Sequence, residues 1–142
     1  MFIKQLSIFI ENKAGRLQDM LAILKDNDIN LASLSLADTS DYGVLRLLVS
    51  DPEKGKEVLK AAGVSCRTTD VLAIKMAHKV GQLQEVLGII CEAEINVEYM
   101  YALATGKDEA SIVIKPSDIA RAAEVLKKAG ASFVTQEDLA NI

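Results

Sequence analysis

The chain has 142 residues, of which half are hydrophobic and a quarter are charged, and its formal net charge is −4. This balance is that of a folded globular protein. The sequence has no basic stripe and no apolar run near the roughly 20 residues of a membrane span, which excludes nucleic acid and membranes as expected partners. Cys66 and Cys91 form no Cys-x-x-Cys motif and indicate a reducing, cytoplasmic location.

The elements of the first half are predicted from the periodicity of apolar residues. Residues 2–10 alternate as a strand with Leu6, Ile8 and Ile10 on one face, and a helical period begins near Leu17. The full predicted order is strand 2–10, loop 11–15, a helix, strand 31–38, turn 39–43, strand 44–50, a helix between Pro52 and Gly63, and a short strand near 64–69.

The second half repeats the first. Residues 15–30 and 81–96 share seven identities in sixteen positions at a shift of 81 − 15 = 66, where composition alone gives roughly one. The elements predicted from this shift are strand 72–76, loop 77–81, a helix, strand 97–104, turn 105–108, strand 109–115, a helix ending at Gly130 and a strand near 131–135. The third strands align at a shift of 65, which pairs Leu47 with Ile112 and makes the second hairpin one residue shorter.

Each half therefore has the order β-α-β-β-α-β, which is the ferredoxin-like unit. We predict an α+β fold with units at 1–68 and 69–142, side by side in a continuous antiparallel eight-stranded sheet with helices on one face. The other, open face is apolar enough to be a docking surface, between the halves or between chains of a homodimer. The residues expected on it are Gln5, Ser7, Phe9, Arg46, Leu48, Ala73 and Val113.

Two segments carry a family resemblance. The first is the loop Asn12-Lys13-Ala14-Gly15-Arg16-Leu17 followed by Ile29-Asn30-Leu31, and the second is Lys79-Val80-Gly81-Gln82-Leu83 followed by Ile95-Asn96-Val97. With the order of elements, they resemble the ACT domain in two tandem copies that span the chain. The resemblance implies a sensor of amino acids that regulates enzymes of amino-acid metabolism, with the effector near the loop before the first helix.

The loop itself suits a small zwitterion. A glycine there allows close backbone approach, and the following helix start offers free N–H groups to a carboxylate. We expect the amides of Gly15, Arg16 and Leu17 to hold the carboxylate. Asn12, Asn30 or neighbouring backbone carbonyls would accept from the amine, and the second strand of the other half, Asn96 to Tyr101, would contact the side chain. The candidate ligand-binding residues are Asn12, Lys13, Ala14, Gly15, Arg16, Leu17, Asn30, Leu31, His78, Val80, Gly81, Gln82, Leu83, Asn96, Val97 and Tyr99.

Structural interpretations stand beside these roles. Gly15 and Gly81 are also what tight turns require, and an asparagine at a strand start can satisfy backbone groups. Tyr99 can equally pack in an interface, and Arg46 can equally form an ion pair across a dimer. The acidic residues that recur after the first helices suit a solvated face. Because His78 replaces Asn12 in the second loop, we expect two unequal sites, the first being the better.

No catalytic constellation is apparent in the sequence. His78 is the only histidine, no Gly-x-Ser-x-Gly occurs, and the set of one histidine and two distant cysteines is too small for a metal site. We therefore expect no enzyme, no metal and no cofactor. The first hypothesis is an amino-acid-binding regulator that acts on an enzyme in trans. The alternatives are a ligand-free dimerisation module and, with less support, a small amino-acid-processing enzyme.

Overall fold

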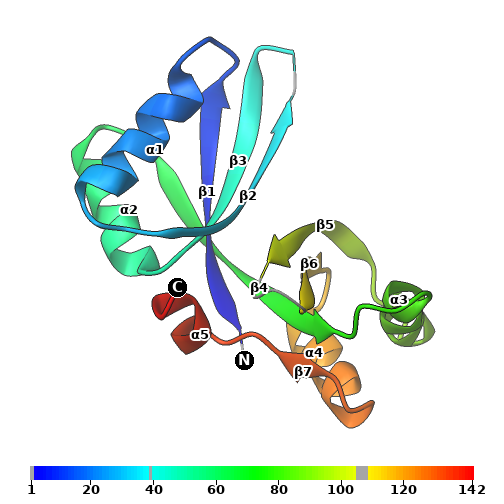
Figure 1. The fold of residues 1–142 in the computed structure, drawn as a ribbon. Coiled ribbons are helices and arrows are strands. Elements are labelled where there is room, and N and C mark those ends of the chain that lie inside the picture. Colours follow the sequence, from blue (N-terminus) through cyan, green and yellow to red (C-terminus); the bar gives the residue numbers. More distant parts are fainter. Residues whose placement is uncertain (1, 39, 105–108) are drawn as a thin grey trace. The chain divides into compact units, whose positions relative to one another are not determined.

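The structure is a computed structural model, which describes residues 2–38, 40–104 and 109–142 (Figure 1). The described residues form an α+β fold, as predicted. Its elements are β1 (Ile3–Glu11), α1 (Arg16–Asp26), β2 (Leu31–Asp38), β3 (Tyr42–Val49), α2 (Pro52–Ala61), β4 (Cys66–Met76), α3 (Gln82–Glu92), β5 (Val97–Ala104), β6 (Ala110–Pro116), α4 (Ile119–Lys128), β7 (Ser132–Phe133) and α5 (Gln136–Ala140). Thr39 and the predicted turn at 105–108 lie outside the described residues.

The strands are hydrogen-bonded in the order β2-β3-β1-β4-β6-β5, and β7 pairs with β4. The described sheet thus has seven strands, and the prediction of eight is wrong. The fourth strand of the first repeat and the first strand of the second are one strand, β4. Thr68 and Thr69 favour extended backbone, and no glycine or proline interrupts β4.

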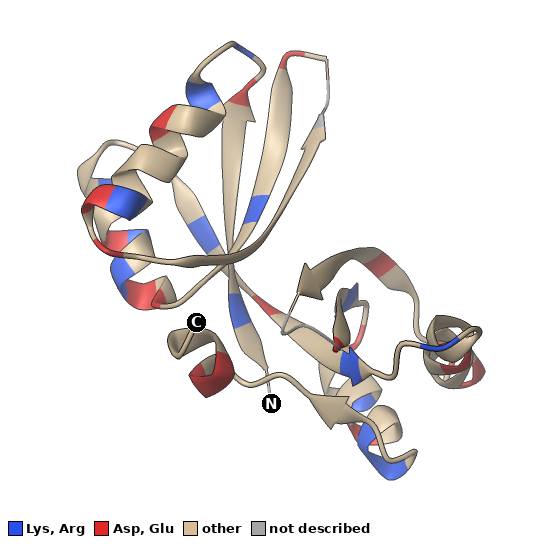
Figure 2. Ribbon diagram, in the orientation of Figure 1, with Lys and Arg blue, Asp and Glu red and all other residues tan. Residues whose placement is uncertain are grey.

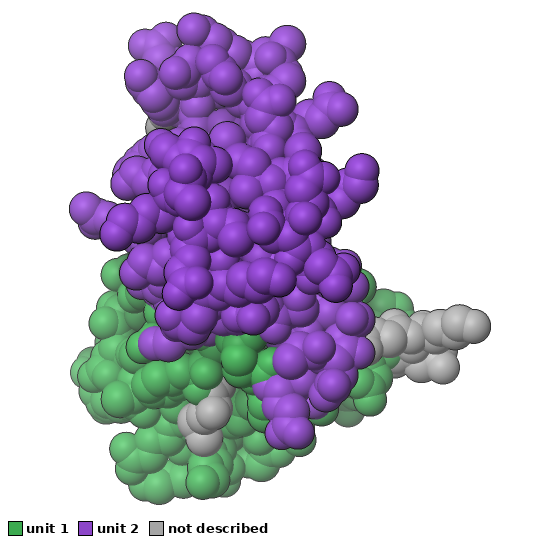
Figure 3. Space-filling view, turned by 90° about the vertical axis from the view of Figure 1, so that its left-hand side faces the viewer, with its two compact units in different colours: residues 1–3, 70–136 green, residues 4–69, 137–142 purple. Residues whose placement is uncertain are grey.

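The chain divides into two compact units, coloured separately in Figure 3. Unit 2 consists of residues 4–69 and 137–142, and unit 1 consists of residues 1–3 and 70–136. Unit 2 thus holds the first repeat together with the end of the chain, which follows the second repeat in sequence. The predicted repeats at 1–68 and 69–142 stay a prediction.

Each unit has its own core on the helix-bearing face of its strands. In unit 2, Leu24 of α1 and Leu59 of α2 pack with buried strand residues that include Leu6 and Leu47. In unit 1, the corresponding cluster joins α3 and α4 to Leu72, Ile74, Ile112 and Ile114. The charged residues of the helices lie outside these clusters (Figure 2). Burial of one helix face against the strands fixes both helices of a unit on the same side.

The register of the third strands corrects the predicted alignment. Leu6 pairs with Leu47 in unit 2, and its counterpart Leu72 pairs with Ile114 in unit 1. The shift between β3 and β6 is therefore 114 − 47 = 67, so the second hairpin is one residue longer, not shorter. The error of two residues left the predicted inward face unchanged, because side chains alternate with a period of two.

The face opposite the helices carries both buried and exposed residues. Gln5, Leu48, Ala73 and Val113 are buried, whereas Phe9 is 73% exposed. The largest exposed apolar residues of β2, Leu34 and Leu36, pair with Leu47 and Leu45 and so lie on the helix-bearing face of an edge strand.

Candidate functional site

The loop between β1 and α1 places Gly15 in the left-handed region, with φ at 87°, as its glycine identity suggests. The Arg16 amide donates to the Lys13 carbonyl at 3.3 Å, so it closes the loop rather than facing a ligand. The next two amides, of Leu17 and Gln18, donate no hydrogen bond within the described part of the chain. Of the three predicted amide donors, those of Gly15 and Leu17 thus stay available among the described residues.

The charges of this loop are already paired. Glu11 Oε2 lies 3.1 Å from Lys13 Nζ and 4.0 Å from Arg16 Nε, and Arg16 also approaches Asp19 at 3.8 Å. The hydrogen bond from Lys13, followed by the charges of Lys13 and Arg16, lowers the pKa of the Glu11 carboxyl. The hollow at this loop, which Asn12 and Leu17 also line, has a volume of about 70 Å³.

The second loop has the same backbone but different side chains. Gly81 has φ at 85°, and the Gln82 amide donates to the Lys79 carbonyl at 3.4 Å. Ala77 stands where the first repeat has Glu11, so the acidic partner of the loop cations is missing. His78, Val80 and Leu83 are exposed.

Asn30 and Asn96 close equivalent turns at the opposite end of the first helices. The backbone N–H of Asn30 donates to Ser50 Oγ, and the backbone N–H of Ser50 donates to the backbone carbonyl of Asn30, both at 2.9 Å. Asn96 and Ser117 form the same two bonds at 3.1 and 2.8 Å. The Asn30 side-chain oxygen accepts from the Leu31 amide at 3.0 Å. This oxygen has a second lone pair, so the role of accepting from a ligand amine stays a prediction for it.

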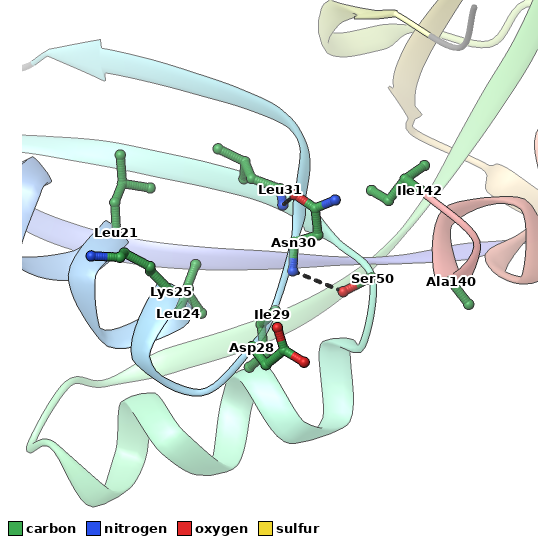
Figure 4. A pocket seen from close by; sticks show the side chains of 10 residues that line it. All are labelled: Leu21, Leu24, Lys25, Asp28, Ile29, Asn30, Leu31, Ser50, Ala140 and Ile142. Carbon is green, nitrogen blue, oxygen red and sulfur yellow. Dashed lines mark hydrogen bonds between the residues drawn. The ribbon is translucent and has the colours of Figure 1, made fainter.

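The Asn30 amide nitrogen, Nδ2, makes no hydrogen bond to the described residues. In Figure 4 the side chain of Asn30 extends toward Ile142, across a pocket of about 570 Å³ in unit 2. The pocket is lined by Leu21, Leu24, Lys25, Asp28, Ile29, Asn30, Leu31, Ser50, Ala140 and Ile142. Its lining is about equally polar and apolar, with Lys25, Asp28, Asn30 and Ser50 beside the aliphatic side chains.

Unit 1 has the equivalent pocket, with a volume of about 540 Å³. Its lining residues are Leu87, Ile90, Cys91, Glu94, Ile95, Asn96, Val97, Tyr99 and Met100. Seven lining residues lie between Leu87 and Val97, and six of them have the same chemical type as their counterparts in the pocket of unit 2. The seventh is Cys91, which replaces Lys25. The pocket of unit 1 has no lining residue from the end of the chain.

Asp28 and Glu94, at equivalent positions of the two pockets, have left-handed backbone with φ at 58° and 57°. Each ends its helix where Gly63 and Gly130 end the second helices, and the Ile29 amide returns to the Leu24 carbonyl at 2.9 Å. A non-glycine residue there costs on the order of 1 kcal/mol. An acidic residue is present in both copies despite this cost.

The structure separates the predicted site residues into two groups within each unit. The loop residues from Asn12 to Leu17 precede α1, whereas Asn30 and Leu31 follow it, and a helix of 11 residues is about 16 Å long. The same holds for His78 to Leu83 and for Asn96, Val97 and Tyr99 around α3. One amino acid cannot touch both groups of the same unit.

Several lining residues were not among the sequence candidates. Ser50 lines the pocket of unit 2, and its counterpart Ser117 lies outside the lining of the other pocket. Each serine precedes an N-cap aspartate, Asp51 or Asp118, that accepts from a first-turn amide, so the repeat carried a signal for Ser50. Asp28 and Glu94 recur as well, but were interpreted only as a solvated face. Ala140 and Ile142 have no counterpart in the first repeat, and the repeat could not indicate them.

The two thiols should differ in reactivity. Cys91 is exposed in the pocket of unit 1, whereas burial raises the pKa of the half-buried Cys66 thiol. A raised pKa leaves less thiolate at a given pH, so alkylation of Cys66 at pH 8 is expected to be at least about tenfold slower. Mass spectrometry after iodoacetamide treatment measures both rates, with Cys91→Ser as the control for assignment. Equal rates would contradict the difference in environment.

The paired β-α-β-β-α-β units and their equivalent pockets define a tandem ferredoxin-like protein. The chain belongs to the ACT domain pair family, whose model matches residues 1–142. The resemblance drawn from the two loop segments is thereby confirmed.

Solved structures show the same fold. Protein BT0572 from Bacteroides thetaiotaomicron is 39% identical, with a TM-score of 0.94 and coverage of 100% of this chain and 98% of that chain. The regulatory subunit of aspartate kinase from Thermus thermophilus, in its ligand-free form, is 14% identical, with a TM-score of 0.61 and coverage of 89% and 91%. No curated protein matches the chain. Among the described residues, no helix is long and apolar enough to cross a membrane.

Proposed function

We propose that this chain binds a free amino acid and, in response, regulates an enzyme of amino-acid metabolism in trans. The observation that carries the proposal is the pair of equivalent pockets, each of a size typical of small-molecule sites and each combining an acidic residue with an asparagine. Membership of the ACT domain pair family supports the regulatory role. A similar structure is the regulatory subunit of a kinase.

In the pocket of unit 2, the polar groups suit the two ends of an amino acid. The Asn30 Nδ2 group is a donor for the carboxylate, and the Asp28 carboxylate is an acceptor for the ammonium group. Glu94 and Asn96 offer the same pair in unit 1. The apolar walls receive the side chain. The loop residues around Gly15 and Gly81 stay a predicted second place for the ligand.

We propose action in trans, without catalysis by this chain; membership of the ACT domain pair family and the likeness to a separate regulatory subunit support this. The free thiols of Cys66 and Cys91 support the cytoplasm as the location.

A thermal-shift screen with the twenty amino acids, each at about 10 mM, tests the proposal. Even a Kd of about 1 mM corresponds to roughly 4 kcal/mol of binding free energy and gives a stabilisation that the screen detects. At least one amino acid is expected to raise the melting temperature by a few degrees. If none of the twenty does, the chain is not an amino-acid-binding regulator.

The assembly module is the second candidate, and the edge strand β2 favours it. Residues 31–37 carry no charge, and Leu34 and Leu36 are 41% and 49% exposed. Uncharged edge strands readily pair with another chain. Light scattering at several protein concentrations, with Leu36→Lys as the comparison, measures this directly. A dimer that the variant abolishes, together with a negative amino-acid screen, would favour assembly alone.

A further inference from the structure

The pockets of the two units differ at one charged position. Of the seven equivalent lining residues, six keep their chemical type, and Cys91 of unit 1 stands where unit 2 has Lys25. Lys25 lies in the last turn of α1, whereas the last turn of α3 has no basic residue. Both pockets keep an acidic residue. Among the described residues, therefore, only the pocket of unit 2 is lined by both a cation and an anion.

The polar groups of the unit 2 pocket are free to contact a ligand. Lys25 and Asp28 are exposed, and neither side chain forms a hydrogen bond or an ion pair with any residue that the structure describes. The Nδ2 group of Asn30 is free in the same sense. Figure 4 shows these three side chains at the end of α1, in the following turn and at the start of β2.

The balance of donors and acceptors indicates which ligand each pocket suits. Unit 2 offers two side-chain nitrogen donors, from Lys25 and Asn30, and one carboxylate, from Asp28. An amino acid with an acidic side chain presents the complement, which is two carboxylates and one ammonium group. In unit 1 the first donor is missing, so Asn96 and Glu94 match only the α-carboxylate and the α-ammonium group.

The rest of the lining agrees with this difference. The lining of unit 1 is mainly apolar and includes Tyr99 and Met100, whereas that of unit 2 is about equally polar and apolar. A charged side chain that leaves water without a partner loses free energy of hydration. The pocket of unit 1 therefore suits an uncharged side chain, and the pocket of unit 2 can compensate a negative one.

We propose that the pocket of unit 2 selects an amino acid with an acidic side chain, aspartate or glutamate, and that Lys25 determines this preference. Cys91 removes the preference from unit 1, whose pocket takes an amino acid with an uncharged side chain. The proposal rests on the proposed function and names the ligand class of each pocket. One chain thus responds to two classes of amino acid.

The expected preference is modest, because Lys25 is exposed. Ion pairs between exposed groups are worth up to about 1 kcal/mol, which corresponds to about fivefold in Kd. Glutamate and glutamine have nearly the same shape and differ in charge, as do aspartate and asparagine. In at least one of these pairs, the acidic member is expected to bind the pocket of unit 2 about fivefold more tightly.

An NMR titration of the full chain tests the proposal at each pocket separately. The better acidic ligand is expected to shift the backbone amide signals of residues 28–31 at about one-fifth of the concentration that its amide needs. Lys25→Met keeps a long side chain without the charge and should bring this ratio to about one, whereas Lys25→Arg should retain it. Cys91→Lys should give the signals of residues 94–97 the same preference. Melting temperatures of the variants report whether the fold is kept.

Each other outcome overturns a stated part. No difference within either pair, an unchanged ratio in Lys25→Met, or no gain in Cys91→Lys would show that this position does not set the charge preference. Shifts at residues 12–17 instead of 28–31 would place the acidic ligand at the loop. If only uncharged or basic amino acids bind in unit 2, the acidic preference is wrong and the proposed function stands. If none of the twenty binds, the proposed function fails with it.

Discussion

Replacing Leu6 or Leu72 with alanine is expected to lower the free energy of unfolding by about 2–5 kcal/mol in each case. Both leucines are fully buried and occupy equivalent positions, 72 − 6 = 66 residues apart, in the cores of units 2 and 1. The loss combines the transfer free energy of the removed methyl groups with the cavity that remains. It is a large part of the 5–15 kcal/mol that stabilises most domains.

Both variants are expected to unfold in a single transition. Strands β1 and β4 each contribute residues to both units, so neither unit can lose its strands without affecting the other. Urea unfolding followed by circular dichroism and by intrinsic tyrosine fluorescence measures this. Two separate transitions, with only one of them shifted by each variant, would show that the units unfold independently.

Gly55 provides an internal check on the cavity. A Cβ added to Gly55 would lie 3.0 Å from Leu6 Cδ1, so Gly55→Ala alone crowds the core. In the Leu6→Ala background the crowding atom is gone, and the added methyl group fills part of the cavity. The free energy of unfolding of the double variant is expected to be about 1 kcal/mol higher than the changes of the two single variants, added together, would give. Additive effects would mean that the cavity collapses or lies elsewhere.

Much of this fold could be predicted because its signals are local or repeated. Alternation along β1 and helical spacing from Leu17 are local, and the segment 15–30 returns at 81–96. The alignment of β3 with β6 was wrong by two residues, since apolar alternation is satisfied equally at a shift of 65 or 67. The continuous strand β4 was missed because a strand that runs from one repeat into the next has no turn to mark it.

The site was harder to predict than the fold. The repeat indicated Asn30 and Asn96, which do line equivalent pockets. The sequence suggested that the Asn30 oxygen accepts from a ligand, and in the structure the Leu31 amide also donates to this oxygen. Such local hydrogen bonds depend on backbone geometry that residue type does not reveal. Nothing in the repeat indicated Ile142, because the segment that carries it occurs only once.

An Asn30→Asp variant is expected to bind the stabilising amino acid at least about a hundredfold more weakly, which corresponds to about 2.7 kcal/mol. The substitution keeps an oxygen that can accept from the Leu31 amide, so the turn that Asn30 forms with Ser50 is retained. It replaces the Nδ2 donor with a negative charge opposite the ligand carboxylate. Like charges brought together in this way cost several kcal/mol.

Isothermal titration measures the loss, and two matched controls locate the ligand. Asn96→Asp makes the same change in the pocket of unit 1 and is expected to leave binding in the pocket of unit 2 intact. Gly15→Asp compared with Gly15→Asn tests the loop, because both share the strain of a side chain at φ 87° and differ only in charge. If Gly15→Asp abolishes binding while Gly15→Asn and Asn30→Asp do not, the carboxylate lies at the loop amides. If Asn30→Asp alone among these variants abolishes it, the carboxylate lies in the larger pocket beside Asn30.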